Sequence, residues 1–109
     1  IKRVRTADGE PIFEENIFVP FDAYRELLTA DLEDKSIFAE VERVGGTPIV
    51  SGGYRTVEAV RANTEQAAEL GIAPHDPLLN LRASFTGPNG EPVLMGKQYY
   101  VGSRYVMVM

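Results

Sequence analysis

The sequence has no cysteine and no tryptophan, and it has one histidine, His75, among its 109 residues. Without cysteine there can be no disulfide, no thiolate zinc site and no cysteine nucleophile. A single histidine excludes a multi-histidine metal centre and argues against a Ser-His-Asp triad. No stretch approaches the ~20 apolar residues of a membrane span, and no signal-peptide pattern opens the chain. We therefore expect no metal, no cofactor and no membrane contact, and we expect the protein to be cytoplasmic.

Positive charge is also in short supply, because 11 Lys and Arg stand against 16 Asp and Glu, a net charge of −5. Duplex DNA is densely negative, so this chain by itself is a poor candidate for a nucleic-acid reader. With 44% hydrophobic and 25% charged residues, the composition is that of one globular domain. The chain starts at Ile1, inside a strand-like pattern, and we interpret it as a piece of a longer protein.

Two similar turns are predicted near the two ends of the chain. The motif Gly-Glu-Pro followed by an aliphatic residue occurs at 9–12 and again at 90–93, each time between strand-like runs. The Pro-Asn-Gly at 88–90 is typical of a type I turn followed by a glycine bulge, which makes a three-residue loop. By analogy, we expect a three-residue loop at 7–9.

The loop length decides on which face of the sheet Glu15 lies. A three-residue loop pairs Arg3 with Phe13 and puts Glu15 on the face of Arg3 and Arg5, whereas a two-residue loop would send Glu15 to the opposite face. The repeat favours the first register.

Capping residues and apolar spacing predict three short helices. The first spans 22–28, with Tyr24, Leu27 and Leu28 as its apolar side. The second is capped by Ser36 and ends at Gly45-Gly46. The third runs from Asn63, which forms a capping box with Gln66, to Gly71. Besides the first hairpin, strands are predicted at 48–61 (with a bulge at Gly52-Gly53), 78–86, 92–101 and from Arg104 to the end.

The second hairpin predicts one core face and one polar, partly aromatic face. The core face holds Leu79, Leu81, Ala83, Phe85, Val93, Met95, Tyr99 and Val101. The other face holds Asn80, Arg82, Ser84, Thr86, Leu94, Gln98 and Tyr100. The fold class is therefore α+β, one antiparallel sheet with short helices packed on it. The apolar segment 105–109 is an edge-strand candidate for dimerisation, unless it is buried centrally.

The clearest chemical pattern is the pair Arg3 and Arg5. Two residues apart on a strand, they lie on one face with their Cα atoms about 6.7 Å apart, so both guanidinium groups can converge on one phosphate or carboxylate. The alternative is two solvated arginines. Glu15 is either their salt-bridge partner or a ligand contact. Ser36 caps a helix, and the same helix start can face an anion. Tyr100 either stacks on a ligand or roofs the sheet.

A set of motifs then occurs in order along the chain. They are Arg-x-Arg at 3–5, Asp-Gly-Glu-Pro-Ile at 8–12, Glu15 five residues before Pro20, Ser-Ile-Phe-x-x-Val-Glu at 36–42, Leu-Gly at 70–71, Leu-Leu at 78–79, Asn-Gly-Glu-Pro-Val at 89–93 and Tyr-Tyr-x-Gly-x-Arg-Tyr at 99–105. Together they resemble the UTRA domain, the effector-binding part of the HutC-type branch of the GntR transcription regulators. The resemblance covers essentially the whole chain, residues 1–109.

The resemblance implies a chorismate-lyase-like fold, homodimerisation and a role in gene regulation. Such domains follow a winged helix-turn-helix that reads an operator; that domain and the family's opening helix-and-strand segment are absent from this chain. DNA would thus be contacted only through the missing domain. Effectors of the family are small phosphorylated or carboxylated acids, and their binding alters the affinity for DNA.

The resemblance also implies a set of site residues. In sugar-phosphate-binding members, the positions matching Arg3, Arg5 and Ser36 hold the anion, and those matching Glu15 and Tyr100 contact the rest of the ligand.

Two positions of the implied site depart from the family pattern. Leu94 stands where many members have glutamate, and Phe38 where they often have tyrosine. Both changes remove polar partners for sugar hydroxyls, which favours an acid with a more apolar body.

Two other functions compete with effector binding. One is an enzyme of the chorismate-lyase kind that acts on a small aromatic acid with Glu15 as the acid, but no activated nucleophile or tuned acid–base pair accompanies it. The other is an oligomerisation scaffold. We expect an effector-binding domain and no enzyme.

Overall fold

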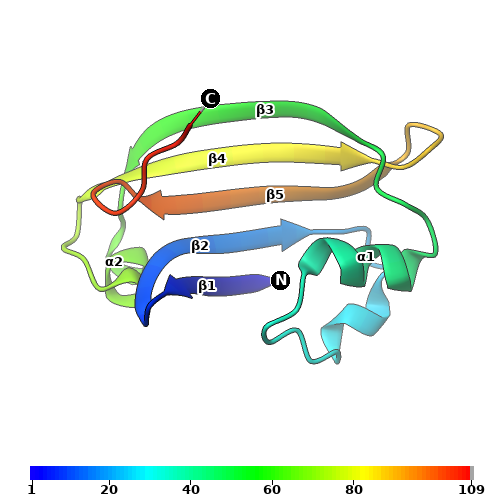
Figure 1. The fold of residues 1–109 in the computed structure, drawn as a ribbon, viewed down its shortest axis with the longest axis horizontal. Helices are drawn as coiled ribbons and strands as arrows, with labels where there is room; N and C mark the ends of the chain where they lie inside the picture. Colours follow the sequence, from blue (N-terminus) through cyan, green and yellow to red (C-terminus); the bar gives the residue numbers. More distant parts are fainter. Residues whose placement is uncertain (109) are drawn as a thin grey trace.

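The computed structural model describes residues 1–108, except for the side chain of Ser51. Its sheet contains β1 (Lys2–Ala7), β2 (Glu10–Phe18), β3 (Ser51–Arg61), β4 (Pro77–Thr86) and β5 (Pro92–Val101) in the order β1-β2-β5-β4-β3, and every neighbouring pair is antiparallel. The helical elements are the 3₁₀ turn η1 (Arg25–Leu28), α1 (Ile37–Gly45) and α2 (Thr64–Leu70). Figure 1 shows α1 and η1 at one end of the sheet and α2 at the other. The predicted α+β class is confirmed.

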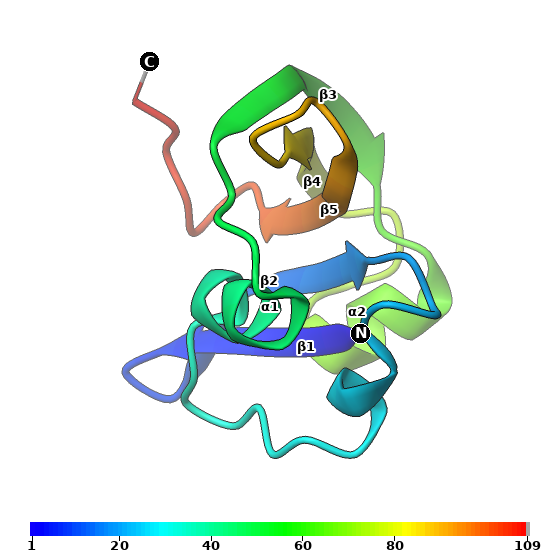
Figure 2. The same cartoon turned by 90° about the vertical axis from the view of Figure 1, so that its right-hand side faces the viewer.

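The register defines two faces of the sheet, because side chains alternate along each strand. What we call the α1 face carries Arg3, Arg5, Phe13, Glu15, Ile17, Arg55, Leu81, Ala83, Phe85, Leu94, Gly96, Gln98 and Tyr100. The α2 face carries Lys2, Val4, Glu14, Asn16, Leu78, Asn80, Arg82, Tyr99 and Val101. Figure 2 shows how strongly the sheet coils, so that β3, β4 and β5 curve over relative to β1 and β2.

The first hairpin has a two-residue loop, so the predicted three-residue loop is wrong. Ala7 pairs with Glu10, which leaves Asp8 and Gly9 as the loop, with φ of 52° and 78°. Positive φ at both central residues is the signature of a type I′ turn, whose twist matches that of the flanking strands.

Glu15 nevertheless lies on the face of Arg3, as predicted. The register shifts between Arg5 and Thr6, because Ile12 is an extra residue on the second strand, and Arg3 pairs with Glu15 instead of Phe13. The bulge cancels the one-residue change that the shorter loop introduced. The predicted face is therefore right, although the predicted register is not.

The second hairpin has the predicted three-residue loop but not the predicted faces. The Gly90 amide donates to the Gly87 carbonyl at 3.1 Å, and the Gly87 amide donates to the Glu91 carbonyl at 2.9 Å. A bulge at Val93 then shifts the register, so that Leu81 pairs with Gln98. Met95, Tyr99 and Val101 therefore do not share a face with Leu79, Leu81, Ala83 and Phe85, whereas Val93, at the bulge, is buried in the same cluster as Leu94. Both faces thus carry apolar residues that need a cover.

The predicted caps are confirmed at both α-helices. The Ala39 amide donates to Ser36 Oγ at 3.3 Å, and α1 ends at the left-handed Gly46. Asn63 and Gln66 form the capping box of α2, which ends at left-handed Gly71.

The first predicted helix, 22–28, forms only the short 3₁₀ turn η1 at its end. Tyr24 and Leu27 are buried as expected, but Leu28 is 68% exposed. A 3₁₀ turn has three residues per turn, so it cannot bring three apolar side chains of this spacing to one side.

Strand β3 begins at Ser51 instead of residue 48, and the predicted glycine bulge is confirmed. Its register against β4 shifts between Gly52 and Arg55. A Cβ atom on Gly53 would lie 2.5 Å from Ser84 Oγ, and the Tyr54 amide donates to that oxygen at 3.2 Å. A side chain at position 53 would therefore displace the Ser84 hydroxyl and break its hydrogen bond with the Tyr54 amide.

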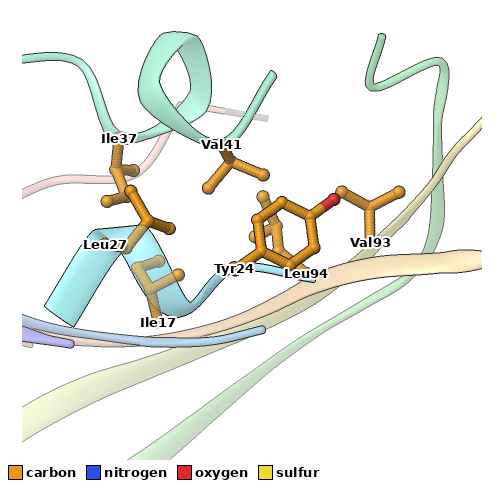
Figure 3. Close-up of a cluster of buried hydrophobic side chains, with 7 residues drawn as sticks. All are labelled: Ile17, Tyr24, Leu27, Ile37, Val41, Val93 and Leu94. Carbon is orange, nitrogen blue, oxygen red and sulfur yellow. The ribbon is translucent and has the colours of Figure 1, made fainter. Parts of the chain in front are cut away.

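Each face has its own apolar cluster. On the α1 face, side chains from the sheet, η1 and α1 meet in a cluster of Ile17, Tyr24, Leu27, Ile37, Val41, Val93 and Leu94 (Figure 3). On the α2 face, the cluster consists of Ala62, Ala67, Leu70, Leu78 and Val101. The two clusters fix α1 and α2 on opposite faces of one sheet.

The predicted strand from Arg104 onward does not form within residues 104–108. Val101 is followed by a turn, and Val106 and Val108 are 83% and 91% exposed. Met109 lies outside the described residues. Arg104 anchors the turn by donating to the carbonyls of Pro11 and Leu70 at 3.0 and 2.8 Å.

Candidate functional site

Arg3 and Glu15 form an ion pair that is almost fully buried. Arg3 Nη2 and Nε donate to Glu15 Oε2 at 2.8 and 3.1 Å, and the two side chains are 15% and 7% exposed. Arg3 Nη1 donates to the carbonyls of Leu32 and Lys35 at 3.0 and 2.9 Å. The salt-bridge alternative for Glu15 is thus the one the structure contains, and Arg3 clamps the segment that precedes α1 onto β1.

Arg5 is different, because its half-buried guanidinium group makes no hydrogen bond or ion pair within residues 1–108. It lines an open groove of about 560 Å³ together with Arg3 and other residues of β1 and with residues 32–34. The groove therefore contains the guanidinium group of Arg5, which has no partner among the described residues, at one end of the α1 face.

The start of α1 lies next to the Arg3 clamp, since Arg3 holds the carbonyl of Lys35. Ser36 Oγ caps the amide of Ala39, whereas the amides of Ile37 and Phe38 have no acceptor in the described part of the chain. Free amides and the helix dipole make this end positive. The cap is confirmed; a ligand contact by Ser36 stays a prediction.

A second, more enclosed hollow of about 230 Å³ lies between the sheet and α1. Its lining consists of Ile17, Phe38, Arg55, Leu81, Ala83, Phe85, Leu94, Gly96 and Gln98. Phe38 stands edge-to-face on Phe85, with ring centroids 5.0 Å apart, and Leu94 is 4% exposed. Phe38 and Leu94, two of the predicted site residues, thus line one hollow.

Tyr100 lies in an aromatic stack and does not line either hollow. Its ring is 4.5 Å from that of Phe13 and 4.1 Å from that of Tyr105, and its hydroxyl donates to Gln98 Oε1 at 3.0 Å. Burial raises the pKa of Tyr100, and the neighbouring Tyr105 and Glu15 add to this shift. Tyr100 therefore contacts the hollow only indirectly, through its hydrogen bond to Gln98, which lines it.

The predicted residues fall into three groups on one face. Arg3, Glu15 and the Ser36 helix start adjoin, Phe38 and Leu94 line the hollow, and Arg5 and Tyr100 flank them.

Arg55 lines the hollow but was not predicted from the sequence to do so. Arg55 lies two residues beyond the Gly52-Gly53 bulge, and the bulge changes which face of the sheet each later residue of β3 lies on. Alternation along β3 alone could not place it opposite Ala83.

Within residues 1–108, no three or more His, Asp or Glu side chains are grouped so that they could hold a metal ion. In the same part of the chain, none of the helices has the length and apolar character needed to cross a membrane.

Behind Glu15, on the α2 face, the buried Glu14 lies beside the partly exposed Glu69 of α2. Glu14 is 5% exposed; its Oε1 accepts from Asn16 Nδ2 at 2.9 Å, and Glu69 Oε1 accepts from Lys2 Nζ at 2.7 Å. The Oε2 atoms of both carboxyl groups are buried without a partner in the described chain. Burial and the nearby Glu69 raise the pKa of Glu14, whereas Lys2 lowers the pKa of Glu69. Of the two carboxyl groups, Glu14 is therefore the one that binds a proton more readily.

We expect Glu14→Gln to stabilise the protein at about pH 8 and to flatten its stability between about pH 5 and pH 8. A carboxyl group whose pKa is higher in the folded state stabilises the fold below its unfolded pKa, about 4.3 for glutamate, and this contribution is lost as the pH rises through the folded value. Glutamine stays neutral and can donate to Glu69 at every pH. Urea denaturation at the two pH values is the measurement.

The matched control for this prediction is Glu58→Gln, at an exposed glutamate of β3. It removes the same charge from a chain of net charge −5. An equal gain in both variants would trace the effect to net charge and contradict the role of the pair.

Comparisons with known proteins place these features in a family context. The family model of the UTRA domain matches residues 1–106. The chain is 33% identical over 108 residues to the HTH-type transcriptional repressor NagR of Bacillus subtilis, covering 99% of this chain and 44% of the repressor. The chain thus spans less than half the length of that curated relative.

Solved structures share the fold over nearly the whole chain. A GntR-family transcriptional regulator from Enterococcus faecalis is similar with a TM-score of 0.84 and 27% identity, covering 99% of this chain and 76% of the other. The effector domain of PhnF from Mycobacterium smegmatis has a TM-score of 0.85 at 24% identity, covering 99% and 67%. These proteins are regulators, and none of the three relatives gives support to the enzyme alternative.

Proposed function

The chain belongs to the UTRA domain family, the effector-binding domains of GntR-family transcription regulators, and we propose that its effector is a small anionic metabolite held on the α1 face. The observation that carries the proposal is an enclosed hollow of about 230 Å³ on the same face as unpaired guanidinium groups. Apolar pockets with a few convergent polar groups are where small ligands bind.

Each predicted residue has a distinct part in this proposal. Arg5 and the free amides at the start of α1 attract and hold the anion, and Arg3 and Glu15 position that helix start. Phe38 and Leu94 contact the body of the ligand, and Tyr100 holds Gln98 in place. Ser36 keeps the helix start in shape by capping it.

We further propose that the domain works within a cytoplasmic homodimer and that DNA is contacted by a winged helix-turn-helix elsewhere in the protein. The exposed apolar side chains of Val106 and Val108 support a role of this segment in pairing with a second copy. An effector that binds one arrangement of the dimer more tightly shifts the dimer toward it, and this changes the affinity for DNA by the same coupling free energy.

We expect Arg5→Ala to weaken effector binding at least about tenfold, because a charge-assisted hydrogen bond contributes roughly 1.5–3 kcal/mol. The effector is first found by thermal shift of the full-length protein against phosphorylated and carboxylated metabolites, and its affinity is then measured by calorimetry.

The control for this prediction is Arg61→Ala, an exposed arginine at the end of β3. It should change the affinity less than roughly twofold, since it removes the same charge outside the site. An equally small effect of Arg5→Ala would show that Arg5 does not hold the anion.

A further inference from the structure

We propose that Tyr105 couples Gln98, in the lining of the hollow, to residues 105–108, which we call the dimer segment. The inference rests on the proposed function, and it names the residues through which effector binding and the pairing of two copies influence each other. It makes Tyr105 a positioning residue, because Tyr105 acts on the hollow through other side chains.

The dimer segment is extended but belongs to no sheet within the described residues. Tyr105 and Met107 are half-buried, whereas Val106 and Val108 are exposed. Such alternation is the period of a β-strand, with one side toward the domain and the other toward solvent. Figure 2 shows the segment, in red, running away from the strands. The side that carries the two valines is therefore open to a second copy.

Tyr105 joins the dimer segment to the domain. Arg104, directly before it, donates to two backbone carbonyls of neighbouring elements at 2.8 and 3.0 Å. The Tyr105 ring stacks on that of Tyr100, with centroids 4.1 Å apart and an angle of 24° between the ring planes. Beyond it, residues 106–108 make no hydrogen bond, ion pair or ring contact within residues 1–108. The stack of Tyr105 on Tyr100 therefore determines where the two valines lie.

Tyr100 connects Tyr105 to the hollow. Its hydroxyl donates to Gln98 Oε1 at 3.0 Å, and Gln98 lines the hollow. Gln98 Nε2 makes no hydrogen bond in the described part of the chain, so it is a donor available to a ligand. Since the amide group is planar, a ligand that accepts from Nε2 also fixes Oε1 and strengthens the hydrogen bond from Tyr100. A bound ligand therefore steadies the stack and, with it, the dimer segment.

A steadied dimer segment favours pairing. A segment that is already ordered loses less conformational entropy when a second copy packs against it. Ligand binding and dimerisation then strengthen each other by the same coupling free energy. Loss of the stack between Tyr105 and Tyr100 breaks this connection, whatever the state of the hollow.

The experiment is a double-mutant cycle on the full-length protein, in which sedimentation equilibrium measures the dissociation constant of the dimer. Gln98→Leu removes the hydrogen bond on the side of the hollow, Tyr105→Leu removes the stack, and a third variant combines both changes. The controls are Tyr105→Phe, which keeps the ring, and Tyr54→Leu, at a half-exposed tyrosine of β3. Circular dichroism verifies that each variant folds.

We expect Tyr105→Leu to weaken dimerisation at least about tenfold, because both copies lose a stacked aromatic pair. Gln98→Leu should weaken it at least about threefold, through the loss of one hydrogen bond in each copy. The double variant should stay within roughly twofold of Tyr105→Leu, since residues that act through one connection are not additive. Tyr105→Phe and Tyr54→Leu should each stay within roughly twofold of the wild type.

The outcomes separate this inference from the proposed function. If the losses of the two single variants multiply in the double variant, Gln98 and Tyr105 act independently and the inference is overturned. The same holds if Tyr105→Leu has no larger effect than Tyr105→Phe or Tyr54→Leu. In these cases the proposed effector site and homodimer stand. A wild type that sediments as a monomer at every concentration contradicts the proposed homodimer, and the inference fails with it.

Discussion

Replacing Arg3 with alanine is expected to lower the free energy of unfolding by about 3–5 kcal/mol, because it leaves the carboxylate of Glu15 buried without its counter-ion. Glu15 is 5% exposed, and both of its hydrogen bonds from a cation come from Arg3. The same change frees the carbonyls of Leu32 and Lys35. The segment before α1 then loses its attachment to β1, so effector affinity should also fall by at least about tenfold.

A double variant distinguishes this explanation from a general loss of packing. Arg3→Met combined with Glu15→Leu replaces the ion pair by apolar groups of similar size, and such replacements are often neutral in stability. The double variant should therefore be more stable than Arg3→Ala alone in urea denaturation. Its effector affinity should remain low, because methionine cannot hold the two carbonyls. A loss below about 1 kcal/mol for Arg3→Ala would contradict the clamp.

Local features of the structure were predictable from the sequence because neighbouring residues determine them. Ser36 and Asn63 each cap a helix with an amide three residues on, and the stop at Gly46 needs only its own backbone angle. These interactions involve one turn of chain, so tertiary packing did not override them. The α+β class follows from the same local patterns.

The register of the two hairpins was not predictable, because single extra residues decide it. Ile12 and Val93 each form a bulge beside a turn whose own residues gave no sign of it. At the first hairpin, the bulge compensated for the wrongly predicted loop length, so Glu15 lies on the predicted face of the sheet. At the second it exchanged the faces of β5 relative to β4.

The candidate site likewise contains features that the sequence predicted and features that only the strand pairing determines. Arg3 and Glu15 were predicted to share a face, but pairwise spacing could not show that they satisfy each other and leave Arg5 as the free cation. Arg55 was missed because its contribution depends on pairing between β3 and β4, which are far from β1 in the sheet. The sequence thus predicted an anion site on this face, and the fold was needed to show which of its arginines have no partner among the described residues.

Leu70→Ala should destabilise the protein by about 2–5 kcal/mol, the range for removing a fully buried leucine and leaving a cavity. Leu70 is 0% exposed and belongs to the cluster that joins α2 to Leu78 and Val101. Urea denaturation measures the loss. Leu28→Ala is the matched control, since Leu28 is 68% exposed and its truncation should cost less than about 0.5 kcal/mol.

Effector binding should respond differently to the two most destabilising variants. The cluster around Leu70 lies on the α2 face, and no residue of that cluster lines the hollow of about 230 Å³. At a temperature where Leu70→Ala is still folded, its effector affinity should therefore stay within roughly twofold of the wild type, because distant sites contribute independently. Arg3→Ala, of similar cost in stability, should lose affinity. If both variants lost it equally, effector binding would depend on the stability of the whole domain, and a local site on the α1 face would be the wrong description.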